Sequence, residues 1–478
     1  MKYVNCLLAS LLFSMLGASS AAAADFFPCV DAHSAPSLNG TLCASEVVPL
    51  SYGDAQLEGM PSVTLFVREF PALKKSRGTV WLVAGGPGES GASLYPFIGV
   101  LRRSFPDFDL ILPDHRGSGF SSRLCPKEEG VDSPGGTALQ GAEWDSCFEY
   151  VNEHADQARA FTLSNGARDL AYLIRQTRPD KPVYLYGVSY GTQLVLRALQ
   201  LGKLPLAGVI LDSLTPLETA PQWDLSQRSR LADAVGRQVL AGCDDHAPCH
   251  AMLGEPAETA YRRLLASAQE KPQLLAAVPG KDLKLFFGSL LDMPALRARI
   301  PFLIKELQQG HDEELKSVLA SMARIQASLA AYPQSPASIP LASLIGRSEN
   351  DLRPDLTPAQ LQQEDQALLF TSSLPALLAK PVLPVYPRDE YFGKQPQQFP
   401  PLLVLNGTLD AKSPYEGALE HVAALRKVGK VSLVSVTGAP RFILWNAPAC
   451  FERQVRDFVG GKTVPDQSCA MAAGESAH

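Results

Sequence analysis

Apolar runs of strand length recur along this chain, separated by turns or by segments with helical spacing. The run at 79–86 is almost wholly apolar, as a central strand should be. In QLVLRALQL, at 193–201, the apolar positions instead recur with the spacing of a helix. This pattern predicts core strands before residue 215 and after residue 396. The expected strands are 63–70, 79–86, 108–112, 183–186, 206–214, 401–405 and 430–438.

One junction between a strand and a helix carries a motif with chemical meaning. The run 183–186 leads into Gly187-Val188-Ser189-Tyr190-Gly191, and the helical segment follows directly. G-x-S-x-G in this setting is typical of a nucleophile elbow, where the serine sits on a strained turn between closely packed elements. The pentapeptide alone also arises by chance in loops, so the flanking strand and helix favour the elbow. Ser189 is therefore the candidate nucleophile.

The strand at 79–86 ends in the glycine-rich segment GGPGESG, at 85–91. Glycines and a proline after a buried strand fix a turn whose backbone amides can point at a substrate oxygen. We predict an oxyanion hole made by the amides of Gly86 and Tyr190, the residue after the candidate nucleophile. An ordinary glycine-rich turn is the alternative. A phosphate-binding loop is disfavoured, because no Lys-Ser or Lys-Thr follows.

Three motifs in order, GGPGESG, DHRGSGFSS and GVSYGT, give the chain a resemblance to a known family. It resembles the proline iminopeptidase and tripeptidyl aminopeptidase branch of the α/β-hydrolases over 63–214 and 399–469, with the middle only loosely matched. The resemblance implies an α/β-hydrolase fold, with a mostly parallel central sheet flanked by helices and a helical cap inserted between core strands. It also implies a serine hydrolase that removes residues from the amino end of peptides and needs no cofactor.

The other two members of a catalytic triad should follow late core strands. Asp410, in the turn after 401–405, occupies the place of the triad acid, although an aspartate that caps the next helix is the alternative. Relatives read approximately G-x-G-H-G after the last strand, and Cys450 fits a cysteine that they carry further on. In this chain Arg441 stands in the histidine's place.

Arginine cannot do the work of that histidine. The base must accept the serine proton near neutral pH, whereas arginine stays protonated in proteins. Arg441 is therefore not a replacement base, although it can pair with Asp410. Other histidines offer no obvious substitute, and a cap histidine that reaches across is the remaining alternative. The histidines are His33, His115, His154, His246, His250, His311, His421 and His478.

His115 looks like a base by residue type but stands at the wrong place. It follows an early strand, whereas in this fold the catalytic histidine follows the last strand. We expect its neighbours Asp114 and Arg116 to organise the loop between them and the next segment.

The segment 216–396 differs in character from the rest. Ala/Leu-rich stretches with helical spacing, such as EELKSVLASMARIQASLAA, alternate with proline breaks. We predict a helical cap here, with a separate domain of unrelated function as the alternative. Relatives often carry a short acidic motif late in the cap for the substrate's amino group, whereas this chain has FTSSLPALL. The expected organisation is a signal peptide at 1–24, core at 25–215, cap at 216–396 and core at 397–478.

The first 24 residues have the pattern of a secretory signal. A lysine near the amino end precedes an apolar run at 7–16 and an A-x-A site at Ala22-Ala23-Ala24. A membrane anchor is the alternative, but the run is shorter than the about 20 residues that span a bilayer. We expect an exported protein, periplasmic or secreted, with no membrane attachment after signal cleavage.

Cysteine usage agrees with export. Of nine cysteines, one lies in the signal, which leaves an even number for disulfides in an oxidising compartment. Eight cysteines allow about 105 pairings, and bridging between sequence neighbours is the simplest. A metal cluster at 243–250, where cysteine and histidine alternate, is the less favoured alternative. The candidates are Cys29, Cys43, Cys125, Cys147, Cys243, Cys249, Cys450 and Cys469.

The composition argues against a nucleic-acid partner but does not identify a substrate. The chain has 478 residues, 46% hydrophobic positions and a formal charge of −6, and no basic run suggests nucleic acid. Two hypotheses stay open. One is an exported, aminopeptidase-like serine hydrolase that acts on peptides or small esters through an acyl-enzyme on Ser189, weakened by the loss of its histidine. The other is a non-catalytic descendant that binds a peptide or partner in the old cleft.

Overall fold

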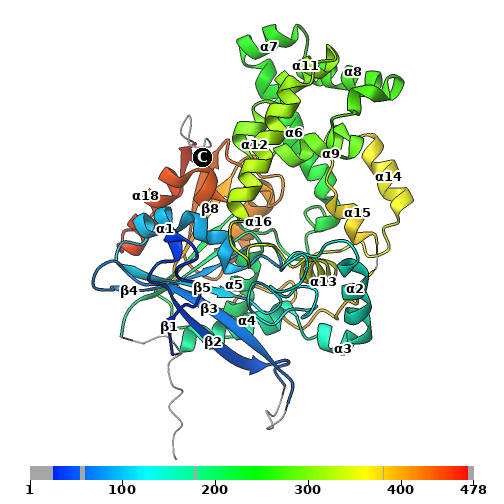
Figure 1. The fold of residues 1–478 in the computed structure, drawn as a ribbon. Coiled ribbons are helices and arrows are strands. Elements are labelled where there is room, and N and C mark those ends of the chain that lie inside the picture. Colours follow the sequence, from blue (N-terminus) through cyan, green and yellow to red (C-terminus); the bar gives the residue numbers. More distant parts are fainter. Residues whose placement is uncertain (1–24, 54–59, 177–179, 381, 472–478) are drawn as a thin grey trace, which may run out of the picture.

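A computed structural model describes residues 25–53, 60–176, 180–380 and 382–471. The predicted signal at 1–24 and His478 lie outside these described residues. The described strands form one sheet in the order β1-β2-β3-β5-β4-β6-β7-β8-β9-β10 (Figure 1). The strands are β1 Phe27–Pro28, β2 Leu42–Pro49, β3 Ser62–Phe70, β4 Gly78–Val83, β5 Phe108–Asp114, β6 Val183–Val188, β7 Gly208–Asp212, β8 Leu402–Gly407, β9 Val431–Thr437 and β10 Gln467–Ala470.

The sheet is mostly parallel, as predicted. Every neighbouring pair from β5 to β10 is parallel, and antiparallel pairing joins only β1, β2, β3 and β5 at one side. Parallel strands need long crossover connections, which the intervening helices supply. The carboxyl ends of β6, β7, β8 and β9 therefore meet at one edge, where ligands bind in open α/β sheets.

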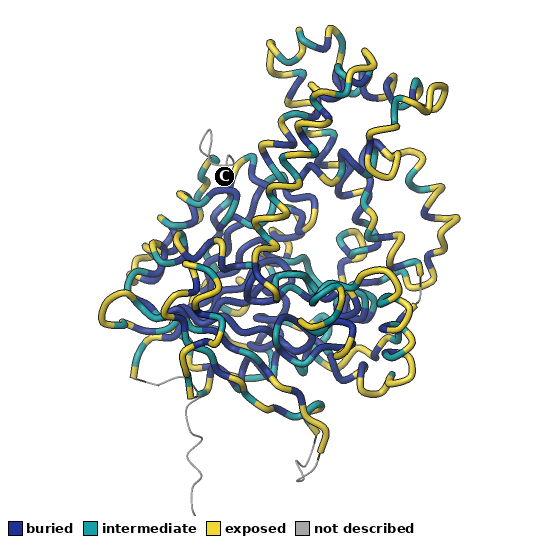
Figure 2. Tube along the Cα trace, viewed as in Figure 1, coloured by how far each residue is buried: buried dark blue, intermediate teal, exposed yellow. Residues whose placement is uncertain are grey.

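Alternate residues of the central strands face two separate apolar layers. Leu185 and Val209 point into a core shared with α4 (Leu163–Arg175) and α5 (Tyr190–Gln200). Tyr186 and Ile210, their neighbours along the strands, point into the opposite core, which includes α1 (Ile98–Ser104) and α18 (Pro448–Val459). Figure 2 shows this buried sheet region beneath a more exposed group of helices. Burial on both faces explains why these strands read as continuous apolar runs.

The chain between β7 and β8 is helical and stands over one end of the sheet (Figure 1). Most of its helices share a third apolar core, in which Phe287 and Phe370 are fully buried. α13 instead lies against the sheet, because its Leu341 and Leu344 pack into the core with α4 and α5. The helices are α6 Arg228–Asp244, α7 Ala247–Leu253, α8 Ala257–Glu270, α9 Leu283–Leu290, α10 Pro294–Arg297, α11 Ile300–Gln308, α12 Glu313–Leu329, α13 Ile339–Glu349, α14 Pro358–Gln366 and α15 Leu374–Leu378.

The remaining helices connect the core strands. None of the described helices is both long and apolar enough to cross a membrane. These connecting helices are α2 Glu143–Glu153, α3 Ala155–Ala158, α16 Tyr415–Leu425 and α17 Ile443–Asn446, with short 3₁₀ helices η1 Pro36–Leu38 and η2 Gly91–Phe97. Three more 3₁₀ helices, η3 Leu225–Gln227, η4 Pro272–Leu275 and η5 Pro279–Lys281, belong to the segment between β7 and β8.

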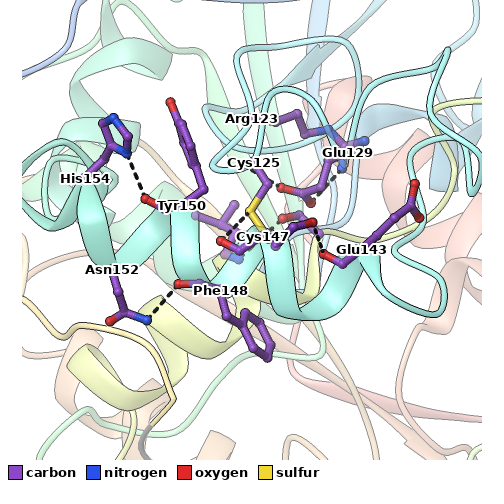
Figure 3. Close-up of a disulfide and its surroundings, with 12 residues drawn as sticks. Arg123, Cys125, Glu129, Glu143, Cys147, Phe148, Tyr150, Asn152 and His154 are labelled. Carbon is purple, nitrogen blue, oxygen red and sulfur yellow. Dashed lines mark hydrogen bonds and ion pairs between the residues drawn. A yellow bond between two sulfur atoms is a disulfide. The ribbon is translucent and has the colours of Figure 1, made fainter.

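Four disulfides join each predicted cysteine to its neighbour in the chain: Cys29–Cys43, Cys125–Cys147, Cys243–Cys249 and Cys450–Cys469. Both cysteines at 243–250 are used in a disulfide, which leaves neither thiolate as a metal ligand. Cys147 lies on α2 next to Phe148, and the two side chains point in different directions (Figure 3). Its disulfide to Cys125 thus ties α2 to the core, beside an Arg123–Glu129 ion pair of 3.3 Å.

Candidate active site

Ser189 lies on a sharp turn between β6 and α5, as an elbow requires. Its φ of 52° is unusual for a residue other than glycine, and its amide donates to the Asp212 carbonyl at 2.9 Å. A Cβ on Gly187 would lie 2.5 Å from the carbonyl oxygen of Gly191, and one on Gly191 would lie 2.5 Å from that of Ala84. Both glycines are therefore needed for strand, turn and helix to pass so closely.

The predicted oxyanion loop lies against the elbow. A Cβ on Gly85 would be only 3.4 Å from the Cβ of Ser189, so the loop after β4 touches the candidate nucleophile. Gly86 and Tyr190 both line the same cavity as Ser189. The Tyr190 amide opens α5, where helix amides have no acceptor within the helix.

Arg441 lies beside Ser189, where the triad histidine was expected. Its Nη1 donates to the serine Oγ at 3.3 Å. Its ion pair goes to Glu89, at 3.9 Å between Nη2 and Oε1, and the pairing with Asp410 that we considered is not formed within 4.0 Å. Burial lowers the pKa of Arg441, but nearby carboxylates, Glu89 foremost, raise it above its ordinary value overall. The serine oxygen therefore accepts a hydrogen bond from a group that stays protonated.

The loop that carries Arg441 is fixed by a residue that the sequence analysis did not single out. The carboxylate of Asp212, at the end of β7, accepts from the amides of Ile443 at 2.8 Å and Leu444 at 3.0 Å. It also accepts from the hydroxyls of Ser213 and Tyr186, both at 3.0 Å. Asp212 is fully buried, and burial raises its pKa. In the sequence, this role could have been suspected from an aspartate that directly follows a buried apolar strand.

Asp410 is almost completely buried at the turn after β8. Its Oδ1 accepts from the amides of Lys412 at 2.8 Å and Ser413 at 2.7 Å, whereas its Oδ2 has no hydrogen-bond partner among the described residues. Burial, assisted by the charge of Asp292, raises the pKa of Asp410 to about 7. Asp410 therefore organises the turn before α16 with one oxygen and leaves the other free, but it does not cap that helix, whose N-cap is Pro414. Its place as the triad acid stays a prediction.

Two further cavity residues came from the cap and were not predicted. Asp292, after α9, pairs with Lys412 at 2.5 Å. Arg228, the first residue of α6, is 9% exposed, and burial lowers its pKa to about 10. A guanidinium with this pKa remains charged at neutral pH. Sequence offered no signal for either residue, because only the folding of the cap over the sheet brings them to Ser189.

A cavity of about 740 Å³ between cap and core is lined by Ser189, Arg228, Asp292 and Arg441. Its walls are largely apolar and include Trp144 and Phe148 from α2, Trp223, Ile339 and Leu377. The segment FTSSLPALL, where relatives have an acidic motif, contributes uncharged residues. They are Thr371, Ser372, Ser373, Leu374, Leu377 and Leu378.

No histidine among the described residues lines this cavity. His115 is buried, its Nδ1 lies 3.1 Å from the Arg116 carbonyl, and burial lowers its pKa to about 4. His421 is buried elsewhere, with its Nδ1 2.7 Å from the Thr215 carbonyl. The expected loop-organising contacts are present. Asp114 accepts from the Gly91 amide at 2.7 Å, and Arg116 pairs with Asp169 at 2.6 Å.

The free oxygen of Asp410 predicts a measurable dependence of stability on pH. An unfolded aspartate titrates near pH 4, so between about pH 4 and 7 only the folded state holds this proton. Wild-type stability should therefore fall as the pH rises through that window. Asp410→Asn keeps an oxygen for both amides and removes the titration.

We expect the advantage of Asp410→Asn over wild type to grow between pH 4 and 7, to at most about 4 kcal/mol, since one pKa unit is about 1.4 kcal/mol. Urea unfolding at several pH values measures this difference, with Asp355→Asn at an exposed position as control. A difference that does not depend on pH would contradict the raised pKa.

A serine on an elbow at the carboxyl edge of a parallel sheet, under a helical cap, defines the α/β-hydrolase class. A family model described as alpha/beta hydrolase fold matches residues 78–242, and one described as TAP-like protein matches residues 378–469. The chain has the α/β-hydrolase fold, as the three motifs predicted, and its carboxy-terminal part is similar to the TAP-like family.

Individual relatives are distant. Serine protease Hip1 of Mycobacterium tuberculosis is 23% identical over 459 residues, which cover 89% of this chain and 86% of that protein. YuaR of Escherichia coli is 27% identical over 210 residues, and the match spans 41% of each protein, less than half of that relative's length. A solved thermophilic esterase from Thermogutta terrifontis is 17% identical, covering 84% of this chain and 94% of that chain with a TM-score of 0.35.

Proposed function

We propose that the protein is an exported serine hydrolase that acts slowly on peptide-like substrates, with Ser189 as the acyl acceptor. The observation that carries this proposal is the position of Ser189 on a strained elbow, in the wall of the cavity and against the glycine-rich loop. Such a turn costs free energy, and strain of this kind clusters at functional sites.

The chemistry would proceed in two steps. The Oγ of Ser189 forms a bond to the substrate carbonyl carbon, and the amides of Gly86 and Tyr190 bind the oxygen that becomes negative. The serine proton passes to water, and a proton returned through water goes to the leaving group as the intermediate collapses to an acyl-enzyme. A second water then hydrolyses the acyl-enzyme to a carboxylic acid and free Ser189. Asp410 takes the place of the triad acid.

The step expected to limit the rate is removal of the proton from the Ser189 hydroxyl. Its neighbour Arg441 only donates hydrogen bonds, and no hydrogen bond within the described part of the chain gives the Oγ a side-chain acceptor for its proton. Loss of a triad base leaves a residual rate of roughly 10³ to 10⁴ over water, from the oxyanion hole and substrate binding. Slow acyl transfer is therefore the expected activity.

The relatives support a peptide substrate. Hip1 is named a serine protease, and the carboxy-terminal match is described as TAP-like. Removal of residues from the amino end is the expectation that the resemblance carries, whereas the acyl-transfer motifs themselves also suit an ester. Export is supported by the signal pattern at 1–24 and by the four disulfides.

A binding protein without turnover is the second candidate. It is favoured by one observation, the hydrogen bond that Arg441 donates to the Ser189 Oγ. This bond occupies a lone pair of the serine oxygen, and the guanidinium that makes it cannot accept the hydroxyl proton. The same cavity would then hold a peptide or partner without cleaving it.

Labelling with a fluorophosphonate separates the two candidates without a guess about substrate. We expect the mature, disulfide-intact protein to label slowly over hours and Ser189→Ala not to label at all. Mass spectrometry of the labelled peptide identifies the modified residue. Equal labelling of both proteins would contradict Ser189 as the nucleophile, and no labelling of the folded wild type would favour the binding protein.

A further inference from the structure

One charged side chain in the cavity has no partner that would explain its burial. Arg228 is 9% exposed, and its Nε is buried without a hydrogen-bond acceptor among the described residues. None of the hydrogen bonds or ion pairs of the described structure involves its guanidinium, which lines the cavity with Ser189. A buried cation without a partner costs free energy, so such groups are normally paired.

The nearby carboxylates do not pair with Arg228, although Asp292 and Asp410 each keep one oxygen without a hydrogen-bond partner among the described residues. Asp292 and Asp410 act on Arg228 only through their charge, since neither lies within ion-pair distance of it. Asp292 is held by Lys412, and the Oδ1 of Asp410 accepts from two amides. The Arg228 side chain therefore retains its hydrogen-bond donors for a molecule in the cavity.

A second guanidinium faces the same space. Arg441 lines the cavity, is 21% exposed, and holds Glu89 only at 3.9 Å. Arg228 and Arg441 both line this cavity, and the charge of Arg441 contributes to the lowered pKa of Arg228. The other charged residues of the lining, Lys380 and the carboxylates of Glu218 and Asp224, do not pair with Arg228: Glu218 is held by Arg197, and Asp224 accepts from the amides of Ser226 and Leu352. The unpaired donors of Arg228 thus favour an anion in this part of the cavity.

The rest of the cavity limits what that anion is attached to. Trp144, Phe148, Trp223 and Leu225 offer apolar and aromatic surface. A planar guanidinium pairs best with a planar carboxylate through two parallel hydrogen bonds. A small inorganic anion would leave the apolar walls unused.

We propose that Arg228 and Arg441 form a carboxylate-binding site beside Ser189, which holds an apolar molecule that ends in a carboxylate. Two sources share this chemistry: the free carboxyl end of a short apolar peptide and a medium-chain carboxylic acid. The inference shares with the proposed function only the cavity at Ser189. Binding of the carboxylate does not require that the protein hydrolyse a substrate. A carboxylate is also what acyl hydrolysis releases, so the site suits a product as well as a ligand.

Binding of matched acid and amide pairs tests the charge requirement. The probes are N-acetylated Leu-Phe with a free carboxylate or a carboxamide, and octanoate or octanamide, measured by calorimetry on the mature wild type and on Ser189→Ala. We expect at least one acid to bind about tenfold or more tightly than its amide, because a charge-assisted pair is lost with the amide. The pair that shows this preference identifies the source.

Variants then assign the preference to the two arginines. Arg228→Met and Arg441→Gln should each abolish the preference for the acid. Arg230→Gln is the matched control, since Arg230 lies on the same helix, is 58% exposed and pairs with Glu364 at 3.6 Å away from the cavity. It should bind like wild type.

Stability gives an independent readout. If Arg228 is retained for a ligand, Arg228→Met should raise the melting temperature while it abolishes acid binding. A structural Arg228 would give the opposite, a lower melting temperature with the acid preference intact, and that result would overturn the proposal. So would equal binding of acid and amide, or no binding of either acid at millimolar concentration. Fluorophosphonate labelling of Ser189 is read separately, so acid binding succeeds or fails whatever the labelling shows.

Discussion

Replacing Arg441 by histidine will raise the rate of fluorophosphonate labelling at Ser189 by about 10³-fold, since a positioned general base typically contributes 10² to 10⁴. The site is prepared for this change in two respects. The Oδ2 of Asp410 has no partner and is free to accept from an imidazole N–H. The backbone at residue 441 is also held, because Asn446 Nδ2 donates to its carbonyl oxygen at 2.7 Å.

Two controls separate a restored base from a relieved hydrogen bond. Arg441→Gln removes the guanidinium without supplying a base, so its labelling should stay within about tenfold of wild type. The double variant Arg441→His with Asp410→Asn should lose much of the gain, because the acid orients the imidazole and stabilises its charged form. Should Arg441→His remain folded and label no faster than Arg441→Gln, the triad reading of this site would be wrong.

The largest loss of stability is expected at Asp212. Its carboxylate accepts four hydrogen bonds in a site that excludes water, two from the amides of Ile443 and Leu444 and two from the hydroxyls of Ser213 and Tyr186. Asp212→Ala leaves these donors buried without an acceptor, which should reduce the free energy of unfolding by about 3–5 kcal/mol. Urea or thermal unfolding measures the loss.

Ser213→Ala is the graded comparison. The Ser213 hydroxyl accepts from the Phe442 amide at 2.7 Å, so its removal affects one end of the same loop at a cost of about 1–2 kcal/mol. Both variants should also loosen the loop that carries Arg441, and hydrogen exchange at 441–446 reports this directly. A stability loss at Asp212→Ala no greater than that at Ser213→Ala would show that the carboxylate does not anchor the loop.

The absence of a histidine at position 441 is compatible with both candidate functions, slow hydrolysis and ligand binding without turnover. Among the described residues no histidine lines the cavity, and the serine oxygen accepts from a group that stays protonated. Slow hydrolysis and ligand binding share the same cavity and the same serine. The carboxylate site gives Arg441 a use of its own in either case.

The sequence by itself determined the core of the fold and the elbow, because these depend on local patterns. Buried parallel strands read as apolar runs, and the turn at Ser189 needs glycines at fixed neighbouring positions. Asp410 and Arg441 were also located from sequence, as the residues after particular strands. The disulfides followed the simplest pairing, between neighbours in the chain.

Only the tertiary structure decided which charges meet at the site. Arg228 and Asp292 come from the cap, far from Ser189 in sequence, and no periodicity records that they share its cavity. For the same reason, Arg441 pairs with Glu89 and not with Asp410 as considered from the sequence, since an ion pair depends on distances across the fold. Likewise, burial raises the pKa of Asp410 to about 7. Sequence supplies the ionisable groups, whereas folding sets their solvation and their neighbours, and these determine what the groups can bind.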